Sequence, residues 1–293
     1  MDKIEQNVIK GIDIYIGNVL VFNDSHEALR DIFAFVAMNL FVGEECGHNE
    51  DIFELFKNLI NSFVSAFYAP KILSFLHPWF HDQTDVLQFF LNDPEIAPDL
   101  DPNNVNCNMI ADVIGIFILA AMSSTSYRAS YALYEAQAIN KQCNGKFKTC
   151  NDINKMVKLD RFIKEAFRLN ADVLGLPRQC VTEPHYTFTN GYQIPSELYL
   201  NEKLQGPNPK EFNASRHKSS TTKLDHNFLL FGHGKHICPG RNYAVTLTKI
   251  TLHHIMLKYN FRTKFENGIA RNHLGFFIGP AKPGESSIVF ENK

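Results

Sequence analysis

The chain has 293 residues, of which 45% are apolar, and its 29 basic and 31 acidic side chains give a formal net charge of −2. This size allows a substantial hydrophobic core in one large domain or two small ones, and the near-neutral charge excludes the basic surface typical of nucleic-acid-binding proteins. The six cysteines are scattered, which argues against a disulfide framework and favours a reducing compartment. No signal-peptide pattern and no apolar run of membrane-spanning length is present. We therefore expect no membrane anchor in this chain.

The first third of the chain is predicted to be mainly helical. Residues 1–45 and 50–92 carry apolar side chains at helical spacing. Within the first range, Ala28–Phe41 is so densely apolar that it should be largely buried. Residues 93–105 contain three prolines among acidic and amide side chains, which favours an exposed loop.

Residues 106–140 contain no proline and a single glycine. They predict one long helix from Asn108 to about Ala138, on the order of 45 Å in length. Its apolar first half should run through the centre of the protein. Four hydroxyl side chains follow that half: Ser123, Ser124, Thr125 and Ser126. They either bond back to the preceding helical turn or place a cluster of hydroxyls over a ligand.

A polar connector, residues 141–154, leads to a predicted helix over Lys155–Leu169. Glu165 and Arg168 lie three residues apart on the same side of this helix, so their side chains can form an ion pair. Pairs of this kind are common on protein surfaces and contribute little to stability. Taken alone, the Glu-x-x-Arg spacing is therefore a weak signal.

The remaining elements are short strands and one further helix. Tyr186–Leu200 alternates around an Asn-Gly pair and predicts a hairpin. A polar loop over 201–227 follows, and Asn242–Tyr259 is predicted to be a largely apolar helix. Residues 276–279 and 287–291 flank a Pro-Gly turn and suggest a final hairpin. The expected fold class is mainly α with small β hairpins.

Between the polar loop and the last helix lies the sequence Phe-Gly-His-Gly-Lys-His-Ile-Cys-Pro-Gly-Arg, residues 231–241. Gly232 and Gly234 can adopt positive φ and turn the backbone tightly beneath a flat ligand. Pro239 suits the first turn of a helix, which would put Cys238 at a helix N-terminus, where a thiolate is favoured. A thiolate in a glycine-rich loop is what an axial ligand to heme iron requires.

Two other interpretations of Cys238 compete with heme ligation. A lone cysteine is usually a small buried apolar side chain. Alternatively, His233, His236 and Cys238 could belong to a zinc site, although such a site needs four ligands and the chain has no C-x-x-C pair to complete it.

The pattern Phe-x-x-Gly-x-His-x-Cys-x-Gly resembles the heme-binding loop of the cytochrome P-450 family. In that family the cysteine is the proximal iron ligand, the phenylalanine shields the sulfur, and the residue two before the cysteine contacts a heme propionate. By resemblance these roles fall on Cys238, Phe231 and His236. The glycines of the same loop also match: Gly232, Gly234 and Gly240.

The same resemblance extends to the helix before the loop. Glu165 and Arg168 match the Glu-x-x-Arg helix of the family, and Arg216 matches the arginine of a Phe-x-x-x-Arg segment that completes a buried triad. The triad is structural and holds the core next to the heme. Arg178 stands where the family often contacts a propionate, a role that suits bidentate arginine geometry.

On the long helix, Ala-Ala-Met-Ser-Ser-Thr aligns with the site where the family activates oxygen. Ser123 stands where an acidic or other polar residue is usual, and Ser124 where a threonine is usual. Ser124 and Thr125 are therefore the candidates for a distal proton relay, with no titratable group to assist them.

The resemblance implies a single partial P-450 domain over residues 1–293, closest to fungal microsomal-type members and lacking the front third of the family fold. That third normally supplies the membrane anchor, the first strands and a Trp-x-x-x-Arg contact to a propionate. The expected parts are, in order: middle helices (1–105), the long central helix (106–140), the Glu-x-x-Arg helix with hairpin and heme-binding loop (155–261), and a C-terminal hairpin (262–293).

The implied function is heme-thiolate monooxygenation, which inserts one oxygen atom of O2 into a small apolar organic substrate. The implied cofactor is heme b (iron protoporphyrin IX). Electrons would come from a separate NADPH-dependent reductase, because the chain carries no flavin or nicotinamide fingerprint. The full-length family type resides at the cytosolic face of the endoplasmic reticulum membrane. This chain, in which no membrane-spanning segment is expected, is predicted to be cytosolic or at a location that the sequence does not specify. The alternative is a truncated, non-catalytic family member with weak or no heme binding.

Overall fold

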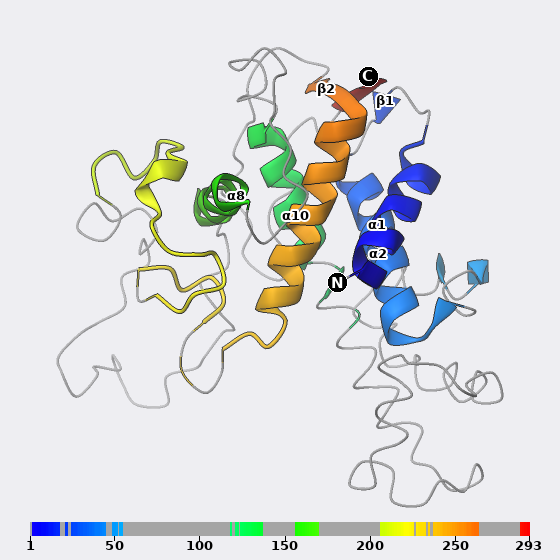
Figure 1. Ribbon diagram of the computed structural model, residues 1–293, viewed down its shortest axis with the longest axis horizontal. Coiled ribbons are helices and arrows are strands. Elements are labelled where there is room, and N and C mark those ends of the chain that lie inside the picture. Colours follow the sequence, from blue (N-terminus) through cyan, green and yellow to red (C-terminus); the bar gives the residue numbers. More distant parts are fainter. Residues whose placement is uncertain are drawn as a thin grey trace, which may run out of the picture. The chain divides into compact units, whose positions relative to one another are not determined.

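The structure is a computed structural model (Figure 1). It describes residues 2–17, 21–22, 25–44, 49–51, 53–54, 118, 121–122, 124–136, 156–169, 206–225, 227–232, 234, 237–263 and 288–293. The chain divides into two compact units. The first comprises Met1–Tyr127, His254–Lys264 and Ser286–Lys293, and the second comprises Arg128–His253 and Phe265–Glu285.

In the first unit, helix α1 (Asp2–Tyr15) packs against helix α2 (Ser25–Phe41). Every residue from 28 to 39 is buried, which confirms the prediction for this segment. Gly11 allows the two helices to approach closely, because a Cβ atom at this position would lie 3.2 Å from Cγ2 of Ile32. The apolar stripe of α1 therefore lies directly on the backbone of α2.

A three-stranded antiparallel sheet belongs to the same unit. Its strands are β1 (Val21–Phe22), β2 (Tyr259–Thr263) and β3 (Ile288–Asn292), in the order β1-β3-β2. In register, Phe261 lies opposite Phe290. Strand β3 agrees with the second strand of the predicted final hairpin, whereas the predicted partner strand, residues 276–279, lies outside the described residues.

Helix α10 (Arg241–Lys258) agrees with the predicted last helix to within one residue at either end. It ends at Lys258 because the chain continues directly into β2. The carbonyl of Lys258 accepts a hydrogen bond from the N–H of Lys293 (3.1 Å), and the hydroxyl of the buried Tyr259 donates to the carbonyl of Gly17 (2.8 Å). Sheet pairing thus replaces the next helical turn.

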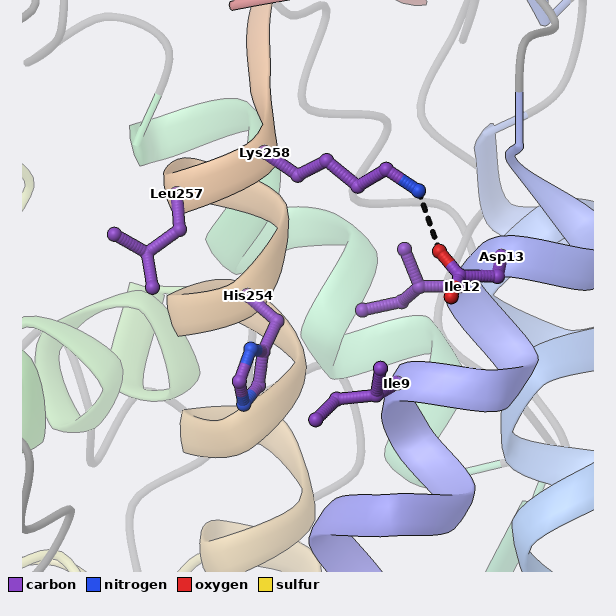
Figure 2. A pocket seen from close by; sticks show the side chains of 6 residues that line it. All are labelled: Ile9, Ile12, Asp13, His254, Leu257 and Lys258. Atoms are coloured by element: carbon purple, nitrogen blue, oxygen red, sulfur yellow. Dashed lines mark hydrogen bonds and ion pairs between the residues drawn. The ribbon is translucent and has the colours of Figure 1, made fainter.

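The last turns of α10 face α1 within the first unit (Figure 2). His254 Nε2 lies 3.0 Å from Glu5 Oε1, and Lys258 pairs with Asp13. Between these helices lies a hollow of about 190 Å³. Its lining residues are Ile9, Ile12, Asp13, His254, Leu257 and Lys258.

The second unit contains helix α8 (Val157–Leu169), the short 3-10 helix η5 (Ala214–Arg216) and the first turns of α10. Helix α8 falls within the predicted range Lys155–Leu169. It packs against η5, and Lys249 on α10 forms an ion pair with Asp160 on α8 (2.5 Å). Helix α8 is therefore held from two sides.

Residues 124–136 are helical and, from 129 onward, buried, in agreement with the predicted long helix. The rest of that helix, apart from residues 118, 121 and 122, lies outside the described residues, as do the predicted loop over 93–105 and the predicted hairpin over 186–200. The described elements are mainly helical with one small sheet, as expected. None of the helices described here is long and apolar enough to cross a bilayer.

Candidate functional site

The loop that carries Cys238 is closed by main-chain hydrogen bonds. The N–H of Cys238 donates to the carbonyl of Phe231 (2.7 Å), and the N–H of Gly232 donates to the carbonyl of Leu229 (2.9 Å). Gly232 and Gly234 adopt φ of 74° and 68°, as the sequence predicts. Side chains other than glycine are strained at such angles. The loop shape therefore depends on its glycines.

Cys238 is a free cysteine and is partly exposed rather than packed into the core. A Cβ atom added at Gly240 would lie 3.9 Å from the Cys238 Sγ, and one added at Gly234 would meet nothing within 4 Å. The loop thus presents a thiol sulfur beside backbone that carries no side chains. This arrangement does not favour the interpretation of Cys238 as a buried apolar side chain.

The sequence suggested that Pro239 lies in the first turn of a helix. Helix α10 begins at Arg241, however, so Pro239 lies in the turn before the helix. Gly240 precedes the helix, and its carbonyl accepts the N–H of Ala244 (2.9 Å). Arg241 folds back, and its Nη1 donates to the carbonyl of Cys238 (3.2 Å). Cys238 is thus tied both to the start of α10 and to Phe231.

A series of ring contacts leads from this loop toward α8. The rings of Phe231 and Phe228 meet edge to face, with centroids 6.4 Å apart, and Phe228 meets His217 in the same way at 6.3 Å. His217 Nε2 lies 2.6 Å from the Glu165 Oε2. The loop and the Glu-x-x-Arg helix are therefore in continuous contact.

Glu165 is the centre of a buried hydrogen-bond network. Arg168 donates to both carboxylate oxygens, Nε to Oε2 at 2.8 Å and Nη2 to Oε1 at 2.9 Å. Arg216 Nε and the main-chain N–H of Asn213 each donate to Oε1 at 2.9 Å. The structure thus brings together the three side chains that the sequence proposes as a triad, and it adds His217 and Asn213.

The side chains of Glu165 and Arg168 are completely buried. Burial alone would raise the pKa of Glu165, but the hydrogen bonds from Arg168, His217 and Asn213 outweigh it and lower the pKa to about 2. A carboxylate that accepts several such bonds is stabilised in its charged form. Glu165 is therefore a structural anion.

The two arginines also hold the segment that precedes η5. Arg168 Nη2 donates to the carbonyl of Pro209 (2.7 Å), and Arg216 Nη2 donates to the carbonyls of Asn208 (3.1 Å) and Glu211 (3.2 Å). These bonds satisfy main-chain oxygens in a segment without strands. The network thus fixes residues 207–216 to α8.

A second set of contacts lies one turn earlier on α8. Lys164, whose side chain is 1% exposed, donates to Ser219 Oγ (2.9 Å), and its ammonium lies 4.9 Å from the centroid of the Phe228 ring. Burial lowers the pKa of Lys164. Asp160 accepts the N–H of Thr221 (2.9 Å). Together these contacts hold residues 219–228 beside the helix.

The hydroxyl cluster on the long helix is only partly described. Ser124 is exposed and Thr125 is 4% exposed. Ser123 lies outside the described residues, as do His236 and Arg178, the two predicted propionate contacts. The relay and propionate roles of these residues stay predictions.

The family model for cytochrome P-450 matches residues 4–285. The chain belongs to the cytochrome P-450 family. Among curated P-450 relatives it is 29% identical over 226 residues to the monooxygenase olcJ of Penicillium canescens, covering 66% of this chain and 40% of the relative. It is 24% identical to cytochrome P-450 83A1 of Arabidopsis thaliana, covering 77% of this chain and 47% of that protein. The chain thus spans less than half the length of these relatives.

The P-450 fold is also evident from a solved structure. The retinoic acid-bound cyanobacterial CYP120A1 matches 99% of this chain and 74% of its own chain, with a TM-score of 0.71 at 17% identity. Membership of the P-450 family implies a heme cofactor. The donor set fits that group, because the loop combines a partly exposed thiol with glycine backbone that a flat ligand can approach.

Two buried polar residues of this region, His217 and Lys164, could not be predicted from the sequence. His217 directly follows Arg216, but no spacing rule links it to Glu165, which is 52 residues away. Lys164 lies four residues before Arg168 on α8 and has the spacing of a solvated charged face, yet it is buried. Lys164 is four residues from Arg168, so it shares a helix face with the predicted ion pair. That shared face is the signal that could have indicated that these charges are covered.

Proposed function

We propose that Cys238 is the proximal ligand of heme b in a heme-thiolate monooxygenase of which this chain forms a part. The observation that carries the proposal is the geometry of the cysteine loop. Cys238 carries a free, partly exposed thiol, its main-chain N–H bonds to the carbonyl of Phe231 at 2.7 Å, and two glycines with positive φ precede it in the loop. Membership of the P-450 family supports the cofactor.

The residues around Cys238 would hold its sulfur in place as the iron ligand. Cys238 lies three residues before Arg241, the first residue of α10, and a cysteine that ligates heme iron does so as the thiolate. Arg241 donates to the Cys238 carbonyl and adds a positive charge nearby. When bound, the heme supplies oxygen activation, to which electron donation from a thiolate contributes by favouring O–O cleavage.

The rest of the loop would shape the space for the porphyrin. Gly232 and Gly234 permit the tight backbone, and Gly240 leaves room beside the sulfur. Phe231 would shield the sulfur, as the family resemblance suggests. His236 and Arg178 would contact the propionates, as the family resemblance suggests. The Glu165 network would hold this part of the core in place.

We further propose Ser124 and Thr125, with Ser123 before them, as hydroxyls that pass protons on the distal side. Such groups can relay protons through water when they are held within hydrogen-bond reach. The substrate would be a small apolar organic molecule. A separate NADPH-dependent reductase at the endoplasmic reticulum membrane would supply the electrons.

The deciding experiment is the reduced, carbon-monoxide-bound difference spectrum of the full chain supplied with heme. The wild type should give the strongly red-shifted Soret band of thiolate ligation, and Cys238→Ser should abolish it. Cys180→Ser removes a thiol elsewhere in the chain and serves as the matched control. Absence of heme uptake, or a band unaffected by Cys238→Ser, would contradict the proposal for this chain and favour a non-catalytic family member.

A further inference from the structure

We propose that His217 is a positioning residue that couples the buried Glu165 network to the loop of Cys238. The inference rests on the proposed role of Cys238 as heme ligand. His217 follows η5 directly, and its side chain is 8% exposed. Its Nε2 lies 2.6 Å from the Glu165 Oε2, which is shorter than the bonds of 2.8–2.9 Å from Arg168 and Arg216 to the same carboxylate.

Besides its bond to Glu165, the His217 ring contacts an aromatic ring that leads to the cysteine loop. The His217 ring meets the Phe228 ring at 68°, with centroids 6.3 Å apart, and Phe228 meets Phe231 at 69° and 6.4 Å. Edge-to-face pairs in this distance range have a preferred geometry and contribute beyond the area they bury. The carbonyl of Phe231 then accepts the N–H of Cys238. A displaced His217 ring would therefore shift the residue that closes the cysteine loop.

Phe228 is suited to transmit such a displacement because it is itself clamped. It is 5% exposed, and the Lys164 ammonium lies 4.9 Å from its ring centroid. Lys164 is fixed in turn by Ser219. Lys164 belongs to α8, and His217 contacts Glu165 on the same helix. The Phe228 ring therefore has two neighbours whose positions depend on α8.

The arginines of the network act on a different segment. Their bonds to main-chain oxygens include those to residues 207–211, before η5. The contacts of His217 instead lead onward to residues 228–238. The arginines and His217 thus hold different segments: the arginines fix the segment before η5, and His217 aligns the loop after it.

Two substitutions separate the two contacts of His217. His217→Gln keeps a hydrogen-bond donor for Glu165 but removes the ring, whereas His217→Phe keeps a ring for Phe228 but removes the donor. The matched control is Thr221→Val, which removes the bond from Thr221 Oγ1 to the Asp160 carbonyl (2.9 Å). Thr221 is buried on the same segment but lies outside the series His217, Phe228 and Phe231.

The first measurement is hydrogen–deuterium exchange, read by mass spectrometry on peptides that cover residues 229–240 of the full chain as isolated. His217→Phe should speed exchange there on the order of tenfold, the ratio expected when one buried hydrogen bond is lost. His217→Gln keeps that bond but loses the ring contact with Phe228, and it should speed exchange there as well. Thr221→Val should leave this exchange at the wild-type rate. The exchange rates of all proteins are compared at urea concentrations equally far below the unfolding midpoint of each protein. Equal acceleration in all three variants would show that His217 is merely structural and would overturn the inference.

The second measurement is the reduced, carbon-monoxide-bound spectrum of the same variants. In both His217 variants the thiolate-type band should decrease, and the band of heme without a thiolate ligand should increase. Thr221→Val should keep the thiolate-type band of the wild type. A wild type that takes up no heme would contradict the proposed function, while the exchange data would still decide on His217. A wild-type thiolate band together with unchanged exchange and spectra in both His217 variants would overturn the inference alone.

Discussion

Glu165 and Arg168 form two parallel hydrogen bonds, 2.8 and 2.9 Å long, with both side chains completely buried. The pair lies on one face of α8 with the spacing i, i+3. On a helix surface this spacing would contribute little. Here the residues after position 206 cover it, so each charge depends on its partner for the hydrogen bonds that water would otherwise supply.

Arg168→Lys should therefore be strongly destabilising. Lysine cannot make the two-pronged contact with Glu165 or reach the carbonyl of Pro209 at the same time. We expect a loss of about 3–5 kcal/mol in the free energy of unfolding, measured by urea denaturation followed by circular dichroism. Arg161→Lys, at a partly exposed position of the same helix, is the control. Equal midpoints for the two variants would contradict the structural role of the pair.

The Glu165 network also predicts a loss of stability in acid. The pKa of Glu165 is lowered from 4.5 to about 2 in the folded state, so its contribution is complete above the unfolded pKa and disappears as the pH falls from about 5 to 2. The contribution is on the order of 3 kcal/mol. Urea denaturation across this pH range should show a steeper decline for the wild type than for Glu165→Gln. Glu211→Gln, which removes an exposed carboxylate, is the control, and parallel profiles for wild type and Glu165→Gln would refute the prediction.

The backbone at Gly234 gives a test of the cysteine loop. Its φ is 68°, and a Cβ atom there would meet nothing within 4 Å. Gly234→Ala should thus cost about 1–2 kcal/mol from backbone strain alone, and Gly234→Asn less, since asparagine tolerates the left-handed region. Gly240→Ala, where the backbone is not in that region and the added Cβ makes an ordinary contact with Cys238, should cost least. Thermal unfolding would measure the order, and equal costs for all three would count against the loop geometry.

Local patterns in the sequence were sufficient for the elements that they specify directly. The apolar density of Ala28–Phe41 predicted burial, and the glycines at 232 and 234 predicted positive φ, because each property depends on the residue itself. The spacing of Glu165 and Arg168 indicated that they could pair, but a Glu-x-x-Arg pair does not reveal whether anything covers it. Its burial and its contact with Arg216 were expected only through the family resemblance.

Contacts between distant segments left no such signal. Strand β1 has two residues and exists through its pairing with β3, more than 250 residues later. No glycine or proline separates α10 from strand β2, which begins at Tyr259. The predicted helix therefore extended to Tyr259, one residue past the observed end of α10. The contact of His217 with Glu165 could not be predicted for the same reason, because only the folded path of residues 206–217 brings the two residues together.

The end of α10 carries both an exposed ion pair, between Lys258 and Asp13 (Figure 2), and a buried hydrogen bond. The side chains of Lys258 and Asp13 are 41% and 56% exposed, and pairs of this kind contribute about 0–1 kcal/mol. The hydroxyl of Tyr259, by contrast, is the donor to the carbonyl of Gly17, the residue just after α1, and Tyr259 is 1% exposed. Tyr259→Phe leaves that carbonyl without this donor and should cost about 1–3 kcal/mol, whereas Lys258→Gln should cost less. Urea denaturation of both variants tests the order. A larger loss for Lys258→Gln would mean that the surface pair, rather than the buried hydroxyl, fixes the end of α10 to α1.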